Sequence, residues 1–421
     1  MADLNDTTAG TPGDQTAGVP VVGTGAAAPA RSRVGWKRLC AFVLIVVVAA
    51  IAGWSAGGAL RQVAATRQGP GFDAFGKALA AAVVVVGVVG ALLVHEVGHL
   101  LGGRLVGFRA LLLIVGPVRL ERNATGWRWR LNRSLALAGG LAASVPTLAV
   151  EPSSLRVRTA VMVAGGPVAS LVVGVLAVVI WRTLGSWSPG PAPALPGQLV
   201  SIGLLTLGAC SAAIGLVTLI PGQTAGFQTD GARLLHLYRG GPNADRDAAV
   251  QAVIASSMGG TRPRDWPPAL LERVRGVDDG SYFEVVGWQL AQMHAADSGQ
   301  RDAARRWLDL VLSHLDRLPE VTRPAVRYDA ARQLAIAGDV EAARALVALG
   351  GRSLGAPFLA PLAELAILVA EGDHDTARQR LPVVRAMIAD GIDPGGAAWL
   401  RDDVAALAAV LDAAEPSAPS R

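Results

Sequence analysis

The segment LLVHEVGHLLGG, residues 92–103, places two histidines and a glutamate inside a run of aliphatic residues. In a helix, His95 and His99 stand one turn apart on the same face. That spacing lets two imidazole nitrogens bind one zinc ion while Glu96 serves as a general base toward water. The alternative is a chance match that forms only a buried polar cluster. The metal site is favoured, because such groups inside a membrane span are costly unless they are paired or liganded.

The composition indicates a membrane protein with a soluble part. The chain has 421 residues, of which 52% are hydrophobic and 17% are charged, against roughly 25% charged residues in ordinary soluble domains. The net charge is +5, but the cationic residues cluster beside apolar runs and form no basic stripe, so we expect no nucleic-acid partner. The two cysteines are too few for a disulfide framework or a thiolate zinc site.

Four apolar runs are long enough to cross a bilayer, which takes ~20 residues. They cover residues 39–60, 78–101, 159–181 and 198–220. Lys and Arg concentrate before the first run and between the second and third, whereas the loop between the third and fourth is almost free of them. The positive-inside rule therefore predicts a multi-pass protein of the cell membrane with a cytoplasmic N-terminus and C-terminal half. The 61–77 loop, with three cations, goes against this orientation.

The 108–150 segment predicts a small membrane-associated β-hairpin. V-R-L-E and W-R-W-R-L alternate with a period of two on either side of a turn at Asn123–Gly126. The next stretch, LALAGGLAASVP at 135–146, is apolar but too broken for a span, and we expect it to be re-entrant or interfacial.

The sequence pattern of residues 241–414, with amphipathic segments that carry charged faces, predicts a soluble helical domain. GQRDAAR at 299, GDVEAAR at 338 and GDHDTAR at 372 each look like a turn entering a helix, spaced 39 and 34 residues apart. A period in the thirties is typical of stacked helix pairs of the tetratricopeptide kind. Such repeats commonly bind a protein or peptide, here expected in the cytoplasm. The tails 1–36 and 415–421 read as disordered.

A catalytic zinc site usually has three protein ligands and one open position. Asp230 is the best third candidate, because it follows a Pro-Gly break at 221–222 where irregular backbone would line a cavity. Local sequence alone supports equally well a role for Asp230 as a helix N-cap. His236 competes poorly as a ligand, since on a helix it would point roughly 120° away from Asp230. Counted inward from flanking arginines, His95, Gly166–Pro167 and Asp230 reach similar depths of ~12–13 Å.

Three motifs, HEVGH at 95–99, AGGPVAS at 164–170 and TLIPG…TDGARLL at 218–235, resemble the site-2 protease family of intramembrane zinc metalloproteases. The similarity covers about residues 80–240. It implies cleavage of peptide bonds in or near transmembrane segments of substrate proteins. His95, His99 and Asp230 would then hold one zinc ion per chain, and Glu96 would activate water.

The same resemblance implies residues that contact the substrate. They are Gly166, Pro167, Ser170, Gly139 and Gly140. A strand edge at 118–120 or 127–131 would pair with an unwound substrate by β-augmentation.

Some positions depart from the family pattern. Ser170 and Thr218 stand where the family usually has Asn, and nine positions separate Pro221 from Asp230, more than is usual. These departures bear on substrate contacts and leave the metal ligands intact. Gly165 and Gly166 have an alternative role as small residues that let helices pack closely in lipid.

The expected protein is mainly α: a membrane core at 37–240 with about four transmembrane helices and a β-hairpin, followed by the helical-repeat domain. Its expected function is that of an intramembrane zinc endopeptidase in the lipid bilayer, acting in regulated proteolysis. The alternative is a catalytically idle, membrane-tethered scaffold whose repeats bind cytoplasmic partners. A transporter or channel is disfavoured, because it would be expected to have more spans and polar residues on several of them.

Overall fold

The structure is a computed structural model. It describes residues 73–414 apart from gaps at 135–136, 138, 148–151, 187–194, 225–226 and 353–355. The predicted tails 1–36 and 415–421 and the predicted span 39–60 lie outside the described residues. Within the described part the protein is mainly helical, with three long apolar helices and a small antiparallel sheet.

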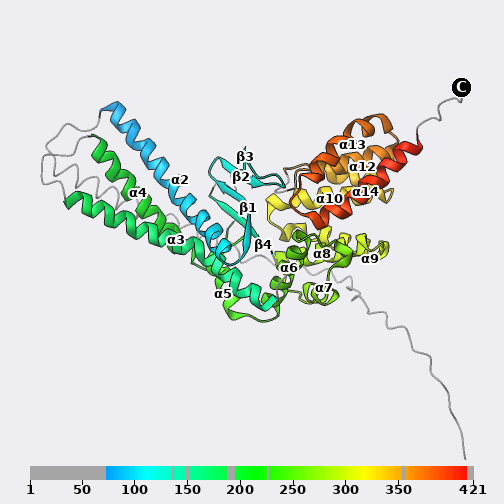
Figure 1. Cartoon of the computed structure of the whole chain (residues 1–421), viewed down its shortest axis with the longest axis horizontal. Helices are drawn as coiled ribbons and strands as arrows, with labels where there is room; N and C mark the ends of the chain where they lie inside the picture. Colours follow the sequence, from blue (N-terminus) through cyan, green and yellow to red (C-terminus); the bar gives the residue numbers. More distant parts are fainter. Residues whose placement is uncertain are drawn as a thin grey trace, which may run out of the picture.

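Three helices are long and apolar enough to cross a membrane: α2 (Ala74–Leu105), α3 (Pro152–Ser186) and α4 (Leu195–Thr218). They match the second, third and fourth predicted apolar runs and lie side by side at one end of the molecule (Figure 1). Their outward residues are mostly aliphatic and exposed, as expected of surfaces that face lipid.

Glycines set the spacing of these helices. A Cβ added to Gly98 of α2 would come within 2.5 Å of the Gly165 carbonyl oxygen of α3. A Cβ added to Gly174 of α3 would lie 3.1 Å from Ala212 of α4. Small residues allow this approach, since tight packing must replace the hydrophobic effect inside a bilayer. Gly165 therefore has the packing role that was its alternative in the sequence.

A four-stranded antiparallel sheet follows α2 in the chain. Its strands are β1 (Phe108–Val115), β2 (Val118–Arg122), β3 (Trp127–Leu131) and β4 (Leu141–Pro146), in the order β3-β2-β1-β4. The predicted hairpin is confirmed as β2–β3, with Leu120 opposite Trp129. Its turn is closed by Asn123, whose side chain accepts a hydrogen bond from the N–H of Gly126 at 2.8 Å.

The structure adds a strand to this segment and corrects one expectation. Residues 141–146 of the stretch expected to be re-entrant or interfacial form strand β4, which pairs with β1. Residues 118–120 offer no free edge, because β2 is hydrogen-bonded to β1 on one side and β3 on the other. Among the described strands, the outer ones of this sheet are β3 and β4.

The chain returns from α4 through a short antiparallel pair, β5 (Gln223–Thr224) and β6 (Phe227–Gln228), into α5 (Asp230–Arg239). The sheet lies between the long helices and the C-terminal helices, and α5 lies near the start of α3 (Figure 1).

Nine further α-helices complete the described chain. They are α6 (Pro242–Met258), α7 (Pro268–Arg275), α8 (Tyr282–Asp297), α9 (Arg301–Ser313), α10 (Arg323–Ile336), α11 (Val340–Ala348), α12 (Leu359–Glu371), α13 (His374–Ala389) and α14 (Pro394–Ala413). Short 3-10 turns lie at Pro263–Asp265, Leu315–Arg317 and Glu320–Thr322.

The three similar sequence segments do introduce helices. Gly299, Gly338 and Gly372 each have a positive φ, and α9, α11 and α13 begin two residues later. Each of these helices packs against the helix before it, which gives the pairs α8–α9, α10–α11 and α12–α13. The largest apolar core of this region is formed mainly by α10 and α12–α14.

The C-terminal helices also contact the rest of the protein. Phe108 of β1 and Leu155 of α3 form a buried cluster with Ala248 and Ala252 of α6. The Thr159 hydroxyl, 1% exposed as a residue, donates to the Gln251 side chain at 2.7 Å. Helix α6 is therefore packed directly on the end of α3.

Candidate metal centre

His95, His99 and Asp230 converge from two distant parts of the chain. Their ligand atoms all lie within 4.8 Å of one another. The Asp230 carboxylate lies 3.1 Å from His95 Nε2 and 3.4 Å from His99 Nε2. These are the three residues predicted as ligands, and in the structure they form a group that could hold a metal ion.

Both imidazoles are held by their other ring nitrogen. His95 Nδ1 lies 3.0 Å from the Ser170 hydroxyl, and His99 Nδ1 lies 3.2 Å from the Met162 carbonyl oxygen. A carbonyl oxygen only accepts hydrogen bonds, so the proton in the His99–Met162 contact is on Nδ1. In neutral His99 the Nε2 lone pair is then free to face the site, which is the tautomer that binds a metal.

The distance between the two Nε2 atoms is 3.2 Å, and the rings meet edge to face. Two imidazole nitrogens and a carboxylate that converge on one point form a donor set suited to zinc. Because each histidine is oriented by a hydrogen bond from behind, the residues present fit the metal that the sequence predicts.

Asp230 is the first residue of α5, and it is not the N-cap of that helix. The N-cap is Thr229, whose hydroxyl accepts from the N–H of Ala232 at 3.3 Å and donates to the Ile220 carbonyl at 2.7 Å. The cap alternative for Asp230 is thus wrong. Gly231 packs on the backbone of Leu219 so closely that a Cβ would clash. These contacts fix the N-terminal turn of α5 against the end of α4.

Glu96 lies beside the histidines and is 7% exposed. The backbone N–H of Ala142 in β4 lies near its carboxylate. Gly140 approaches the same carboxylate so closely that a Cβ would overlap Glu96 Oε1, and its φ of +110° favours glycine. The start of β4 thus brings the backbone N–H of Ala142 near the Glu96 carboxylate, and the missing side chain of Gly140 leaves space for that carboxylate.

Of the five residues predicted to contact substrate, three lie at the metal centre and two do not. Gly140 touches Glu96, Gly166 packs against the His99 ring, and Ser170 bonds His95, so all three lie at the centre. Pro167 is buried, with its carbonyl 3.1 Å from a Cβ that would stand on Gly215 of α4. Gly139 is exposed and has nothing within 4 Å of such a Cβ, so the structure does not bring it to the ligands.

The sequence did not reveal the contacts that orient the centre. The Met162 carbonyl carries no side-chain signal, and Ser170 was expected at the substrate. His236, rejected as a ligand, does point elsewhere: its Nε2 lies 2.9 Å from Asp247 of α6.

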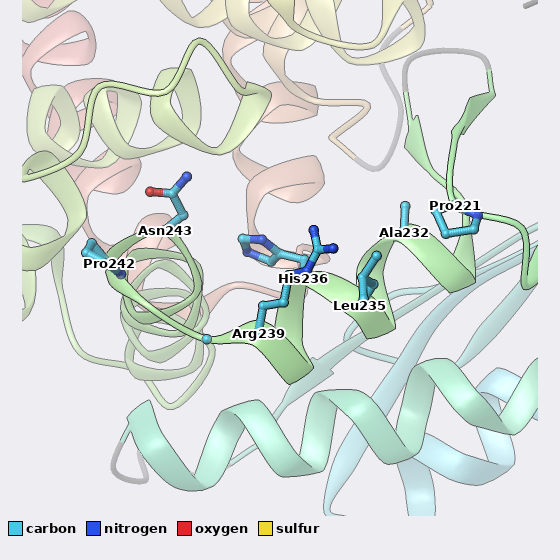
Figure 2. Close-up of a pocket in the computed structure, with 8 residues that line it drawn as sticks. Pro221, Ala232, Leu235, His236, Arg239, Pro242 and Asn243 are labelled. Atoms are coloured by element: carbon cyan, nitrogen blue, oxygen red, sulfur yellow. The ribbon is translucent and has the colours of Figure 1, made fainter. Parts of the chain in front are cut away.

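A separate pocket of about 440 Å³ lies between α5 and the start of α6 (Figure 2). His236, Arg239 and Asn243 are among the residues that line it, and none of the three converging ligands does.

The chain matches no model of a protein family, and comparisons with characterised proteins and with solved structures also give no match.

Proposed function

We propose that this protein is an intramembrane zinc endopeptidase that cleaves substrate proteins in or near their transmembrane segments. The observation that carries the proposal is the convergence of His95, His99 and Asp230 beside a buried Glu96, next to three apolar helices. The motifs that resemble the site-2 protease family agree with it.

His95, His99 and Asp230 would hold the ion, which leaves room for water as a catalytic site requires. Bound zinc supplies Lewis acidity, which makes water a nucleophile near neutral pH. Ser170 and Met162 keep the imidazoles oriented, so no reorganisation is needed when the ion binds.

Glu96 is the general base in this proposal. Its carboxylate takes a proton as the water oxygen attacks the substrate carbonyl carbon, and it returns that proton to the leaving amine nitrogen as the C–N bond breaks. The Ala142 N–H lies beside the carboxylate.

Strand β4 supports a place for the substrate backbone. It is an outer strand of the sheet, and it contacts Glu96 through Ala142. Strand β3, the other outer strand, stands three strand positions away, which is ~14 Å at the usual spacing. An extended substrate that pairs with β4 would therefore meet Glu96, whereas one on β3 would not.

The charge pattern of the sequence favours a cytoplasmic N-terminus and cytoplasmic helices α6–α14 in a multi-pass protein of the cell membrane. The three helix pairs support a tetratricopeptide-like domain that binds a cytoplasmic protein or peptide. Together with the apolar run at 39–60, the three long helices would give a core of four spans.

The test compares membrane-protein fragments in cells that produce the wild-type chain or Glu96→Gln at equal levels. The proposal expects fragments cut within or beside a transmembrane segment to disappear in Glu96→Gln, while the zinc content of the purified variant is unchanged. Identical fragment patterns would instead support the idle scaffold, in which the helix pairs alone are functional.

A further inference from the structure

We propose that His236 and Asp247 are positioning residues that hold the metal ligand Asp230 in place through helix α5. The inference rests on the proposed metal centre and adds a role for the C-terminal helices: they complete the site. The contact between these two side chains joins α5 to α6.

Helix α5 carries a metal ligand at its first residue, where Thr229 and Gly231 fix it against the end of α4, and it is held at its other end by contacts to α3 and α6. Asp230 is its first residue, and His236 and Leu237 lie in its last turn. The helix has 10 residues, so it is ~15 Å long and moves as a short rigid rod. A tilt of the C-terminal end would pivot the helix about its N-terminal contacts and would turn the Asp230 carboxylate away from the histidines, where ligand geometry tolerates only about 0.5 Å of error.

The anchor is a buried polar contact. His236 Nε2 lies 2.9 Å from the Asp247 carboxylate, whose side chain is 5% exposed. The other oxygen of Asp247 accepts two hydrogen bonds from Arg246, at 3.1 and 2.8 Å. Arg246 is 1% exposed and also binds both carboxylate oxygens of Asp279, just before α8. Asp247 and Arg246 of α6 therefore link α5 to Asp279, which precedes α8.

Arg156 of α3 secures the same end of α5. Its guanidinium donates to the Leu237 carbonyl at 3.0 Å and lies 3.4 Å from Asp245 of α6. Gly240 lies so close to this guanidinium that a Cβ there would clash. Three elements, α3, α5 and α6, therefore meet through polar contacts at this end.

Apolar packing contributes little between α5 and the start of α6, because the pocket of about 440 Å³ separates them. Figure 2 shows His236 reaching from α5 toward the side of α6, with Arg239 on the same helix. Within the described residues, the polar contacts of His236 and Arg156 bridge this gap. Loss of one contact should therefore change the orientation of α5 without unfolding the cores on either side.

The experiment measures the zinc affinity of the full chain in detergent, by competition with a chelating dye, for wild type, His236→Gln and Asp247→Asn. Both variants are expected to raise the zinc Kd about tenfold, the low end of the range for groups that orient metal ligands. The double variant should match either single variant, because one contact is lost in each case. Circular dichroism should show unchanged helix content.

Matched controls separate positioning from general damage. His294→Gln removes a histidine whose side chain, among the described residues, bonds the Pro263 carbonyl, and Asp297→Asn neutralises a buried carboxylate paired with Arg262. Neither contact involves α5, so both controls should keep the wild-type Kd.

The outcomes distinguish the two proposals. A wild-type chain without zinc would overturn the proposed function and this inference with it. A wild-type chain that binds zinc, with His236→Gln and Asp247→Asn within twofold of its Kd, would overturn the positioning role alone. If Asp247→Asn fails to fold, His236→Gln decides the question by itself.

Discussion

The Nε2 atoms of His95 and His99 lie 3.2 Å apart, with the Asp230 carboxylate within 3.4 Å of both. Two unprotonated imidazole nitrogens at this distance repel one another unless a cation or a proton lies between them. The hydrogen bonds behind the rings, to Ser170 and Met162, point both nitrogens at the same place. This arrangement is what a metal site requires.

The first prediction concerns Gly140. A side chain there would overlap the Glu96 carboxylate and would need a φ of +110°. We expect Gly140→Ala to lower the cleavage rate at least about tenfold, since a small displacement of a catalytic group is costly, with zinc content unchanged. Gly139→Ala is the control, because nothing lies within 4 Å of its Cβ position. Equal activity of the two variants in a substrate-processing assay would show that Gly140 has no role at Glu96.

The second prediction concerns Ser170. Ser170→Ala removes the hydrogen bond to His95 Nδ1, so the zinc Kd should rise about tenfold or more. Ser170→Thr keeps the hydroxyl and should retain most of the affinity. The matched control is Ser211→Ala in α4, since the Ser211 hydroxyl is buried and has no hydrogen-bond partner among the described residues. A zinc titration in which Ser170→Ala and Ser211→Ala behave alike would refute the orienting role.

The third prediction concerns the contact between Asp390 and the β2–β3 hairpin. The Asp390 carboxylate accepts from Asn123 at 2.9 Å and lies 3.1 Å from Arg128, and its carbonyl accepts from the N–H of Ala124 at 3.1 Å. We expect Asp390→Ala to free the hairpin tip and to speed amide hydrogen exchange across residues 123–131, read by mass spectrometry. Asp375→Ala, which alters a side chain that is 94% exposed, should leave the exchange unchanged. An unaltered hairpin in Asp390→Ala would mean that the Asp390 carboxylate does not hold it and that the sheet and the backbone bond to Ala124 suffice.

The fourth prediction concerns acid stability. Burial acts to raise the pKa of Asp279, but hydrogen bonds from Arg246 and Ser281 outweigh it and lower that pKa from 3.8 to about 2. A lowered folded-state pKa gives stability that is fully present above the unfolded value and is lost as pH falls toward 2. Asp279→Asn should therefore destabilise the chain at pH 7 by about 1 kcal/mol, after allowance for solvent screening. This difference should shrink between pH 4 and pH 2.

Thermal unfolding in detergent across this pH range measures the effect. Asp302→Asn serves as the comparison, because Asp302 is exposed on α9. A destabilisation by Asp279→Asn that is constant from pH 7 to pH 2 would contradict the assigned ion pair.

The sequence predicts the parts of the molecule that have strong, regular patterns. Hydropathy locates α2, α3 and α4, because a span must be apolar along its whole length. The spacing of His95 and His99 predicts their shared face, and depth along the spans points to Asp230. The alternating residues of β2 and β3 identify the hairpin.

Other features depend on tertiary contacts that leave no pattern in the sequence. The sequence FRALLLIV does not alternate between apolar and polar residues, because the last four residues of β1 are all buried. The sequence pattern therefore does not predict this strand. The residues of β4 show no strand pattern, and their pairing with β1 depends on a tertiary contact. Thr229 and Asp230 are both good N-cap residues, and tertiary contacts decide between them: Thr229 bonds Ile220 and Ala232, while Asp230 faces the histidines. The Met162 carbonyl and the His236–Asp247 contact could not be found from spacing.

The most direct test of the central claim is the zinc content of the purified full-length wild-type chain, measured by elemental analysis after exhaustive dialysis in detergent, with His95→Ala/His99→Ala measured alongside. The account predicts about one zinc ion per wild-type chain and none in the double variant. A wild-type chain without zinc, or a double variant that keeps the same amount, would contradict it.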